Sequence, residues 1–138
     1  MVETTSPHLK LAAEAIWSDA DVERFGRAIF GEVFSADLKP ALVRADGRAR
    51  RTLFEARRAG VGTDQRKLVE SPRMPVAVLN GAEDPFINLD YLDSISFKNL
   101  WRGQCHRIAG AGHAPLLQKP TVFNETLGEF LAELAKDV

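Results

Sequence analysis

An aspartate and a histidine lie in two short glycine-containing segments, and together these side chains can transfer protons. Asp84 belongs to the segment GAEDP at 81–85, and His113 belongs to GAGHAP at 110–115. A carboxylate beside an imidazole accepts the Nδ1 proton, fixes the tautomer of the ring and stabilises its charged form. The glycines before His113 allow a tight turn that exposes the ring. Asp84 and His113 are therefore the candidate catalytic residues of this chain.

Each of the two segments follows a predicted β-strand. The run Val76–Leu79 is apolar, rich in β-branched residues and too short for a helix, and Gly81 is expected to end it. Such a run is typical of a strand buried on both faces of a parallel sheet. A second strand is predicted over Gln104–Ile108, with a helix between the two strands within Leu89–Leu100. This order implies a right-handed crossover and a parallel pair, so both segments should leave the sheet at the same edge.

The rest of the chain is predicted to be helical. Residues 1–70 form an all-helical part and residues 71–138 an α/β part that closes with a helix over Pro120–Lys136. In the first part, helices are expected to begin at Ser6-Pro7, with proline at N1, and at Ser18, whose spacing to Asp21 matches a capping box. Further predicted features of this part are an interruption at Pro40 and Gly47, a helix over Arg48–Ala59 that ends at Gly60, and a short helix over Gln65–Val69.

This order of motifs resembles the α/β-hydrolase superfamily. In that family a strand is followed by G-x-x-D with the catalytic acid, a crossover, G-x-G-H with the catalytic histidine, and a closing helix. Residues Met74–Leu134 match the order throughout, including Pro75 before the strand and Pro120 in the last helix. The resemblance implies that Asp84 is the acid, that His113 is the general base, and that residues 1–70 are the helical lid. It also implies a partial α/β-hydrolase fold with a small parallel sheet.

A nucleophile is missing from this picture. The family's nucleophile usually sits at a G-x-S-x-G elbow upstream of the lid. Neither Cys105, nor an aspartate, nor any serine of the chain has that glycine framing, the serines being Ser6, Ser18, Ser35, Ser71, Ser94 and Ser96. We therefore expect two members of a catalytic triad without the third, and no activity of the chain alone.

The intact enzyme that the resemblance implies would hydrolyse an ester, amide or related bond without a cofactor. A metal site is not expected, because the chain has no HExxH motif or Cys/His cluster. Two other functions stay open. The chain can be a non-catalytic binding or oligomerisation module derived from a hydrolase, or one half of a split hydrolase whose other half is a separate chain.

Simpler explanations exist for several of these residues. Taken singly, Asp84 starts an Asp-Pro turn and His113 is a loop histidine that caps a helix, whereas their joint occurrence favours catalysis. An arginine cluster would suit an anionic substrate, but a solvated helix face balanced by Asp46 and Glu55 is the favoured interpretation. Its members are Arg44, Arg48, Arg50, Arg51, Arg57 and Arg58. Aromatic side chains that would suit a substrate pocket are more often core residues, and these are Trp17, Phe25, Phe30, Phe34 and Trp101.

Composition narrows the location and the partners. A net charge of −1 gives no electrostatic reason to expect nucleic acid. The apolar runs are shorter than the roughly 20 residues that a bilayer span requires, and residues 1–7 lack the features of a secretory signal. The single cysteine, Cys105, excludes an intrachain disulfide and fits a reducing compartment. We expect a cytoplasmic protein that binds neither nucleic acid nor membrane.

The chain is also predicted to form a homodimer. The expected strand Val76–Leu79 has no charge or internal proline to protect a sheet edge, and a two-stranded sheet is marginal by itself. Pairing of two such edges about a twofold axis would give an antiparallel junction and a continuous four-stranded sheet. Exchange of the lid between protomers is an alternative with the same driving force.

Overall fold

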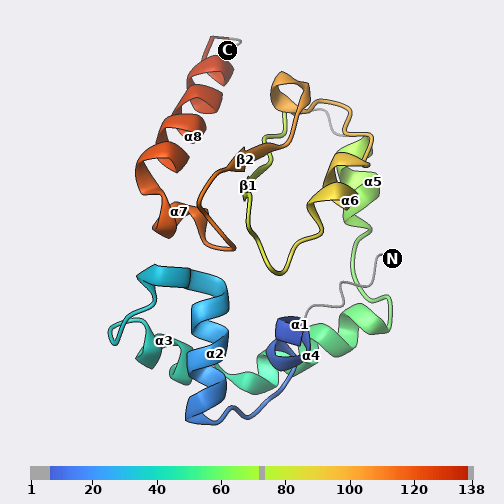
Figure 1. The fold of residues 1–138 in the computed structure, drawn as a ribbon. Coiled ribbons are helices and arrows are strands. Elements are labelled where there is room, and N and C mark those ends of the chain that lie inside the picture. Colours follow the sequence, from blue (N-terminus) through green and yellow to red (C-terminus); the bar gives the residue numbers. More distant parts are fainter. Residues whose placement is uncertain (1–6, 72–73, 137–138) are drawn as a thin grey trace. The chain divides into compact units, whose positions relative to one another are not determined.

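The computed structural model describes residues 7–71 and 74–136. These residues form two compact units, and the boundary along the chain lies between Thr63 and Asp64. The boundary predicted from the sequence lies at residue 70. In the structure the helix that follows Asp64 belongs to the second unit. Figure 1 shows the elements of both units along the chain.

The first unit is built from helices wherever the structure describes it. These are α1 (Pro7–Ala12), α2 (Asp19–Phe30), the 3-10 turn η1 (Gly31–Val33), α3 (Lys39–Arg44) and α4 (Gly47–Arg58). The predicted capping box is present: the Ser18 hydroxyl accepts the Asp21 amide at 3.2 Å, and the Asp21 carboxylate accepts the Ser18 amide at 3.0 Å. Pro40 does not interrupt a helix but lies in the first turn of α3, where its missing N–H costs nothing.

The first helix, α1, ends at Ala12, and a tryptophan side chain bonds to its last turn. Its predicted cap, Ser6, lies outside the described residues. The indole of Trp17 donates to the carbonyl oxygen of Leu11 at 2.8 Å, so the chain turns back over the helix end. Trp17 also packs 4.6 Å from the ring of Phe25, which is buried together with Leu11 and Val22. Trp17 and Phe25 thus act as core residues of this unit.

The second unit contains the predicted parallel sheet. Its elements are α5 (Gln65–Glu70), β1 (Leu79–Gly81), α6 (Leu89–Asp93), η2 (Trp101–Gly103), β2 (His106–Ile108), α7 (Pro115–Gln118) and α8 (Pro120–Leu134). β1 and β2 pair in parallel, with Leu79 opposite His106 and Gly81 opposite Ile108. In Figure 1 the two strands lie side by side, with α8 on one side and α5 and α6 on the other. The strand-helix-strand-helix order is confirmed.

The first strand is displaced from its predicted position at Val76–Leu79. Val76 forms an isolated parallel bridge with Leu100, and the regular ladder begins only at Leu79 and includes Gly81. The segment that pairs with residues 76–79 explains this interruption of the ladder. After Leu100 the segment forms η2, in which Arg102 adopts a left-handed conformation with φ of 53°. Extended pairing resumes where the Val78 carbonyl accepts the His106 amide at 2.8 Å. Residues 76–79 are half-buried and not fully buried as expected.

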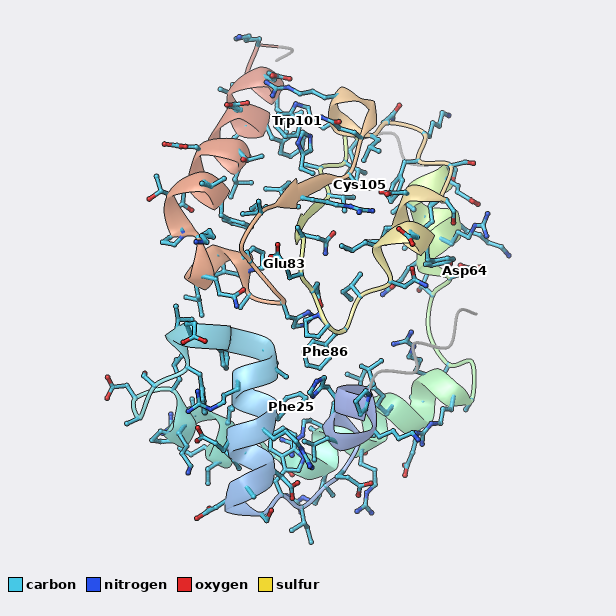
Figure 2. All side chains as sticks on the ribbon, viewed as in Figure 1. Phe25, Asp64, Glu83, Phe86, Trp101 and Cys105 are labelled. Atoms are coloured by element: carbon cyan, nitrogen blue, oxygen red, sulfur yellow. The ribbon has the colours of Figure 1, made fainter. Side chains whose placement is uncertain are left out.

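The last helix, α8, is attached to the sheet through η2. The indole of Trp101 donates to Glu133 at 2.6 Å, and Arg102 pairs with Glu129 at 2.7 Å. Trp101 is buried beside α8 (Figure 2), with its ring 5.5 Å from that of Phe130. Two apolar residues of α8, Val122 and Leu131, are exposed. Among the described helices, none is long and apolar enough to cross a membrane.

Candidate active site

The loop after β1 presents Asp84 as a buried carboxylate. Its side chain is 2% exposed. One carboxylate oxygen accepts the backbone amides of Phe86 at 2.8 Å and Ile87 at 3.2 Å, closing a turn around Pro85. Asp84 therefore does start an Asp-Pro turn, and that turn fixes its carboxylate at the end of the strand.

The loop after β2 brings His113 against this carboxylate, as predicted. The Nδ1 atom of His113 lies 2.9 Å from one oxygen of Asp84 and 3.1 Å from the other. These distances are those of a direct hydrogen bond. An ionised carboxylate only accepts hydrogen bonds, so Nδ1 must carry the proton and Nε2 is the basic nitrogen. The His113 side chain is 36% exposed, which leaves part of the ring accessible.

The hydrogen bonds keep Asp84 ionised despite its burial. Burial alone would raise the pKa of this carboxyl. The hydrogen bond to His113 and the backbone amide of Phe86 act in the opposite direction and outweigh it, so the pKa of Asp84 lies below its ordinary value. The carboxylate can then orient the imidazole and stabilise its charged form over the physiological pH range.

Three residues that the sequence reasoning missed complete this site. The Glu83 carboxylate accepts the Gly110 amide at 3.2 Å, and the Gln118 side-chain oxygen accepts the Gly112 amide at 2.8 Å. The ring of Phe86, which is buried, packs 4.6 Å from that of His113. Glu83 stands in the motif itself, and Pro115 at the start of α7 was the signal that could have placed Gln118 on a helical turn beside the loop.

A close backbone approach explains the glycine at the end of β1. A Cβ atom on Gly81 would lie 2.0 Å from the carbonyl oxygen of Gly112 and 2.3 Å from that of Ala111. The Glu83 amide donates to this same Ala111 oxygen at 3.0 Å. Gly81 thus lets the loop that carries His113 cross directly over the strand that leads to Asp84.

Three of the candidate serines are engaged elsewhere. Ser71 and Ser94 donate to backbone carbonyl oxygens in their own helical turns, at 2.9 Å and 2.7 Å, and Ser18 caps α2. Burial and the nearby carboxylate of Asp93 raise the pKa of the Cys105 thiol, the reverse of what a reactive thiolate needs. Ser6 lies outside the described residues. Within them, the hydrogen bonds of the His113 ring run to Asp84.

The arginine cluster is divided between two roles inside the first unit. Arg48 forms an ion pair with Asp46 at 2.9 Å, as the solvated-face interpretation expects. Arg50 instead stacks on the Trp17 ring, with its guanidinium carbon 3.7 Å from the ring centroid, and donates to the Ala45 carbonyl at 3.0 Å. The other members are exposed, namely Arg44, Arg51, Arg57 and Arg58.

A cavity of about 560 Å³ in the second unit is separate from the Asp84–His113 pair. It is lined by residues of α6, of the segment that follows α6, of η2, and of the two positions before β2, including Asp93 and Cys105. No group of three or more His, Cys, Asp or Glu side chains in the described ranges could hold a metal ion.

Comparison with known proteins places this geometry in a known fold. No family model matches the chain, and no curated protein matches it. Solved structures of the N-acyl homoserine lactonase AidH are similar. A serine-to-glycine variant complexed with N-hexanoyl homoserine lactone is 42% identical with a TM-score of 0.88, over 92% of this chain and 47% of the AidH chain. AidH complexed with N-butanoyl homoserine gives the same identity and TM-score over 92% and 46%.

A third AidH structure agrees with these two. A glutamate-to-glycine variant complexed with N-hexanoyl homoserine is 41% identical with a TM-score of 0.89, over 94% of this chain and 47% of that one. The chain thus spans just under half the length of these neighbours. It matches the C-terminal part of an α/β-hydrolase and has the corresponding partial α/β-hydrolase fold.

Proposed function

We propose that Asp84 and His113 are the acid–base pair of a hydrolase active site whose nucleophile lies in the part of the fold that this chain does not match. The observation that carries the proposal is the 2.9 Å contact between His113 Nδ1 and a carboxylate that is 2% exposed. A buried, ionised aspartate in direct contact with a partly accessible imidazole is the arrangement that general-base catalysis needs.

The pair would act through the nitrogen that Asp84 does not occupy. His113 Nε2 takes the proton of a hydroxyl nucleophile as that oxygen attacks an ester carbonyl carbon. The same nitrogen then returns the proton to the leaving alcohol oxygen, and a water molecule, activated in the same way, releases the acyl group. Asp84 keeps the ring in the required tautomer and balances its positive charge while the proton resides on it.

A lactone is the substrate class that the neighbours favour. AidH structures hold N-hexanoyl homoserine lactone in one case and N-acyl homoserines in two others. An N-acyl homoserine is what remains when water opens the ester bond of the corresponding lactone. At 41–42% identity we propose that the site containing Asp84 and His113 belongs to an enzyme acting on a lactone or similar ester.

Taken alone, the 138-residue chain should not turn over such esters. General acid–base assistance contributes about 10²–10⁴-fold and needs a nucleophile to assist. We expect hydrolysis of p-nitrophenyl esters and of N-hexanoyl homoserine lactone to be no faster than with an equal concentration of free imidazole. Turnover that disappears in both Asp84→Asn and His113→Ala would contradict this and reveal a nucleophile within the chain.

The decisive experiment supplies the missing part. A chimera joins the AidH segment that lies outside the match to this chain, and its lactonase activity is measured. We expect activity in the chimera and a loss of about 10²–10⁴-fold in kcat for His113→Ala and for Asp84→Asn. Asp90→Asn is the matched control, because the Asp90 side chain is 98% exposed and lies on α6. A folded but inactive chimera, or equal effects of Asp84→Asn and Asp90→Asn, would refute the proposal.

A non-catalytic oligomerisation module is the second candidate function. The observation that favours it is the two-stranded sheet, since β1 pairs with β2 on one side and the described chain adds no strand on the other. Several apolar side chains are also more than half exposed, among them Ile16, Leu53 and Val61. A folded but inactive chimera together with a stable dimer of the chain would support this function.

A further inference from the structure

The loop that carries His113 depends on contacts from outside it. It runs from the end of β2 at Ile108 to the start of α7 at Pro115, and Gly110 adopts a positive φ of 70°. Two backbone hydrogen bonds reach it from the Asp84 loop: the Ala82 amide donates to the Ile108 carbonyl at 3.0 Å, and the Glu83 amide donates to the Ala111 carbonyl at 3.0 Å. Ala111 is 1% exposed, so this end of the loop is held in the core.

The residue next to His113 is held by the side chain of Gln118. Gln118 Oε1 accepts the Gly112 amide at 2.8 Å in a partly buried contact. The Gln118 backbone is itself fixed, since its amide donates to the Ala114 carbonyl at 3.0 Å as the last residue of α7. A Cβ on Gly112 would lie 3.5 Å from Gln118 Nε2 and 3.7 Å from the Glu83 carbonyl oxygen, so Gly112 sits between these two residues.

A second side-chain contact on the same loop is weaker. Glu83 Oε1 accepts the Gly110 amide at 3.2 Å, in an exposed position and three residues before His113. The Gln118 contact is shorter, less exposed and directly adjacent to His113. Of the two side-chain contacts, that of Gln118 is the one next to His113 in sequence.

We propose that Gln118 is a positioning residue: by accepting the Gly112 amide, its side chain holds His113 in hydrogen-bonding contact with Asp84. The inference deepens the proposed function and rests on it, because alignment of the pair matters only if the pair transfers protons. A 1 Å displacement of a catalytic group is enough to lose much of its effect.

The test measures the alignment directly in the 138-residue chain by NMR. The readout is the solvent-exchange rate of the His113 Nδ1 proton, together with the ring nitrogen shifts that report the tautomer. Gln118→Met keeps the side-chain length and removes the acceptor, and we expect about tenfold faster exchange, the effect of losing one buried hydrogen bond. Gln118→Glu keeps an acceptor oxygen and should stay close to the unsubstituted chain. Glu83→Gln should change the rate less than Gln118→Met.

Controls separate positioning from folding. The Trp101 indole resonance reports whether the second unit remains folded, because Trp101 packs on α8 away from the loop. A folded Gln118→Met variant with unchanged exchange, or a Gln118→Glu variant as fast as Gln118→Met, would overturn the proposal. If Gln118→Met does not fold, the test uses the unsubstituted chain. The Gly112 amide proton and the His113 Nδ1 proton should then have equal protection factors against solvent exchange, and unequal factors would overturn the proposal.

The same variants in the AidH chimera distinguish this inference from the proposed function. If both hold, Gln118→Met lowers kcat about tenfold with KM unchanged, and Gln118→Glu restores it. If the chimera is inactive while the exchange result holds, the proposed function fails and the coupling of Gln118 to His113 stands. If the chimera is active and Gln118→Met changes neither kcat nor exchange, the positioning role fails and the proposed function stands.

Discussion

At the scale of single residues, Asp84 combines two roles that the sequence presented as alternatives. Its carboxylate closes a turn through the amides of Phe86 and Ile87, and the same group accepts the ring proton of His113. The turn holds the carboxylate in place beside the histidine. A turn-forming aspartate is therefore a suitable orienting acid, because its local hydrogen bonds stabilise the ionised form.

The stability of the second unit should depend on pH through Asp84. Its pKa is lowered in the folded state, so the ionised carboxylate stabilises the fold above the unfolded carboxyl pKa of about 3.9. This stabilisation is lost as the pH falls through the lower folded pKa. Asp84→Asn should reduce the free energy of unfolding by about 1.5–3 kcal/mol at pH 7 and flatten its decline in acid. Urea unfolding between pH 2 and pH 7 measures both effects.

The Asp90→Asn variant is the control for this measurement. The Asp90 side chain is 98% exposed and has only a long contact to Arg107, at 3.8 Å. Its substitution should leave the acid limb of the stability curve in place. Equal curves for the two variants would mean that the carboxylate of Asp84 is not coupled to folding.

At the scale of elements, the site depends on how closely one loop approaches one strand. The β1 strand is three residues long, and its last residue, Gly81, lies under the Ala111 and Gly112 carbonyls. These neighbours are backbone atoms of a loop that Glu83 and Gln118 also hold. A side chain at position 81 would therefore push the His113 loop away as a whole.

Two glycine substitutions test this packing. Gly81→Ala places a Cβ 2.0 Å from the Gly112 oxygen, and we expect the free energy of unfolding to fall by about 1–3 kcal/mol. We also expect the hydrogen bond between His113 and Asp84 to be lost. Gly128→Ala in α8 has no neighbour within 4 Å and should stabilise the helix by about 0.5–1 kcal/mol. Thermal unfolding measures both. A Gly81→Ala chain as stable as the unsubstituted chain would show that the loop can move without cost.

At the scale of the whole molecule, the outer edge of β1 is the feature that bears on assembly. In the parallel ladder, Val78, Asn80 and Ala82 direct their backbone groups towards β2. Those of Ala77, Leu79 and Gly81 point to the opposite edge, where the described chain adds no strand. This edge differs in its bounds from the predicted one at 76–79, but it keeps the character that makes sheet edges associate.

We propose that two copies of the chain pair through this edge. A single substitution can block this pairing without removing a hydrogen bond between β1 and β2. Ala77→Pro removes an N–H group that faces away from β2, which proline tolerates at a sheet edge. The unsubstituted chain should run as a dimer, twice 15.2 kDa, in light scattering after size exclusion, and Ala77→Pro as a folded monomer.

Asn80→Pro is the matched control for the edge, because it removes an N–H that faces β2 and should unfold the second unit. A monomeric unsubstituted chain at micromolar concentration would refute the dimer. A dimeric Ala77→Pro chain would place the interface elsewhere, with lid exchange between protomers as the remaining mode.

Signals within short stretches of sequence determined much of this protein. The capping box at Ser18 and Asp21, the end of α4 before Gly60 and the start of α8 at Pro120 follow from local hydrogen bonding and backbone geometry. The parallel order of the two strands follows from the crossover between them. The placement of Asp84 and His113 at one sheet edge follows in turn from that order.

Only the tertiary structure decided the features that depend on contacts between distant residues. The ladder begins at Leu79 because the left-handed conformation of Arg102 redirects the segment that pairs with β1. The Arg50 side chain is not on the solvated face of α4 because it stacks on the Trp17 ring. Pro115 can indicate the helical turn that carries Gln118, but the hydrogen bond from the Gly112 amide to its side chain does not follow from sequence, since a glutamine is equally compatible with solvent. Hydrogen bonds of this kind form only where packing removes water from both partners, and that packing is a property of the folded chain.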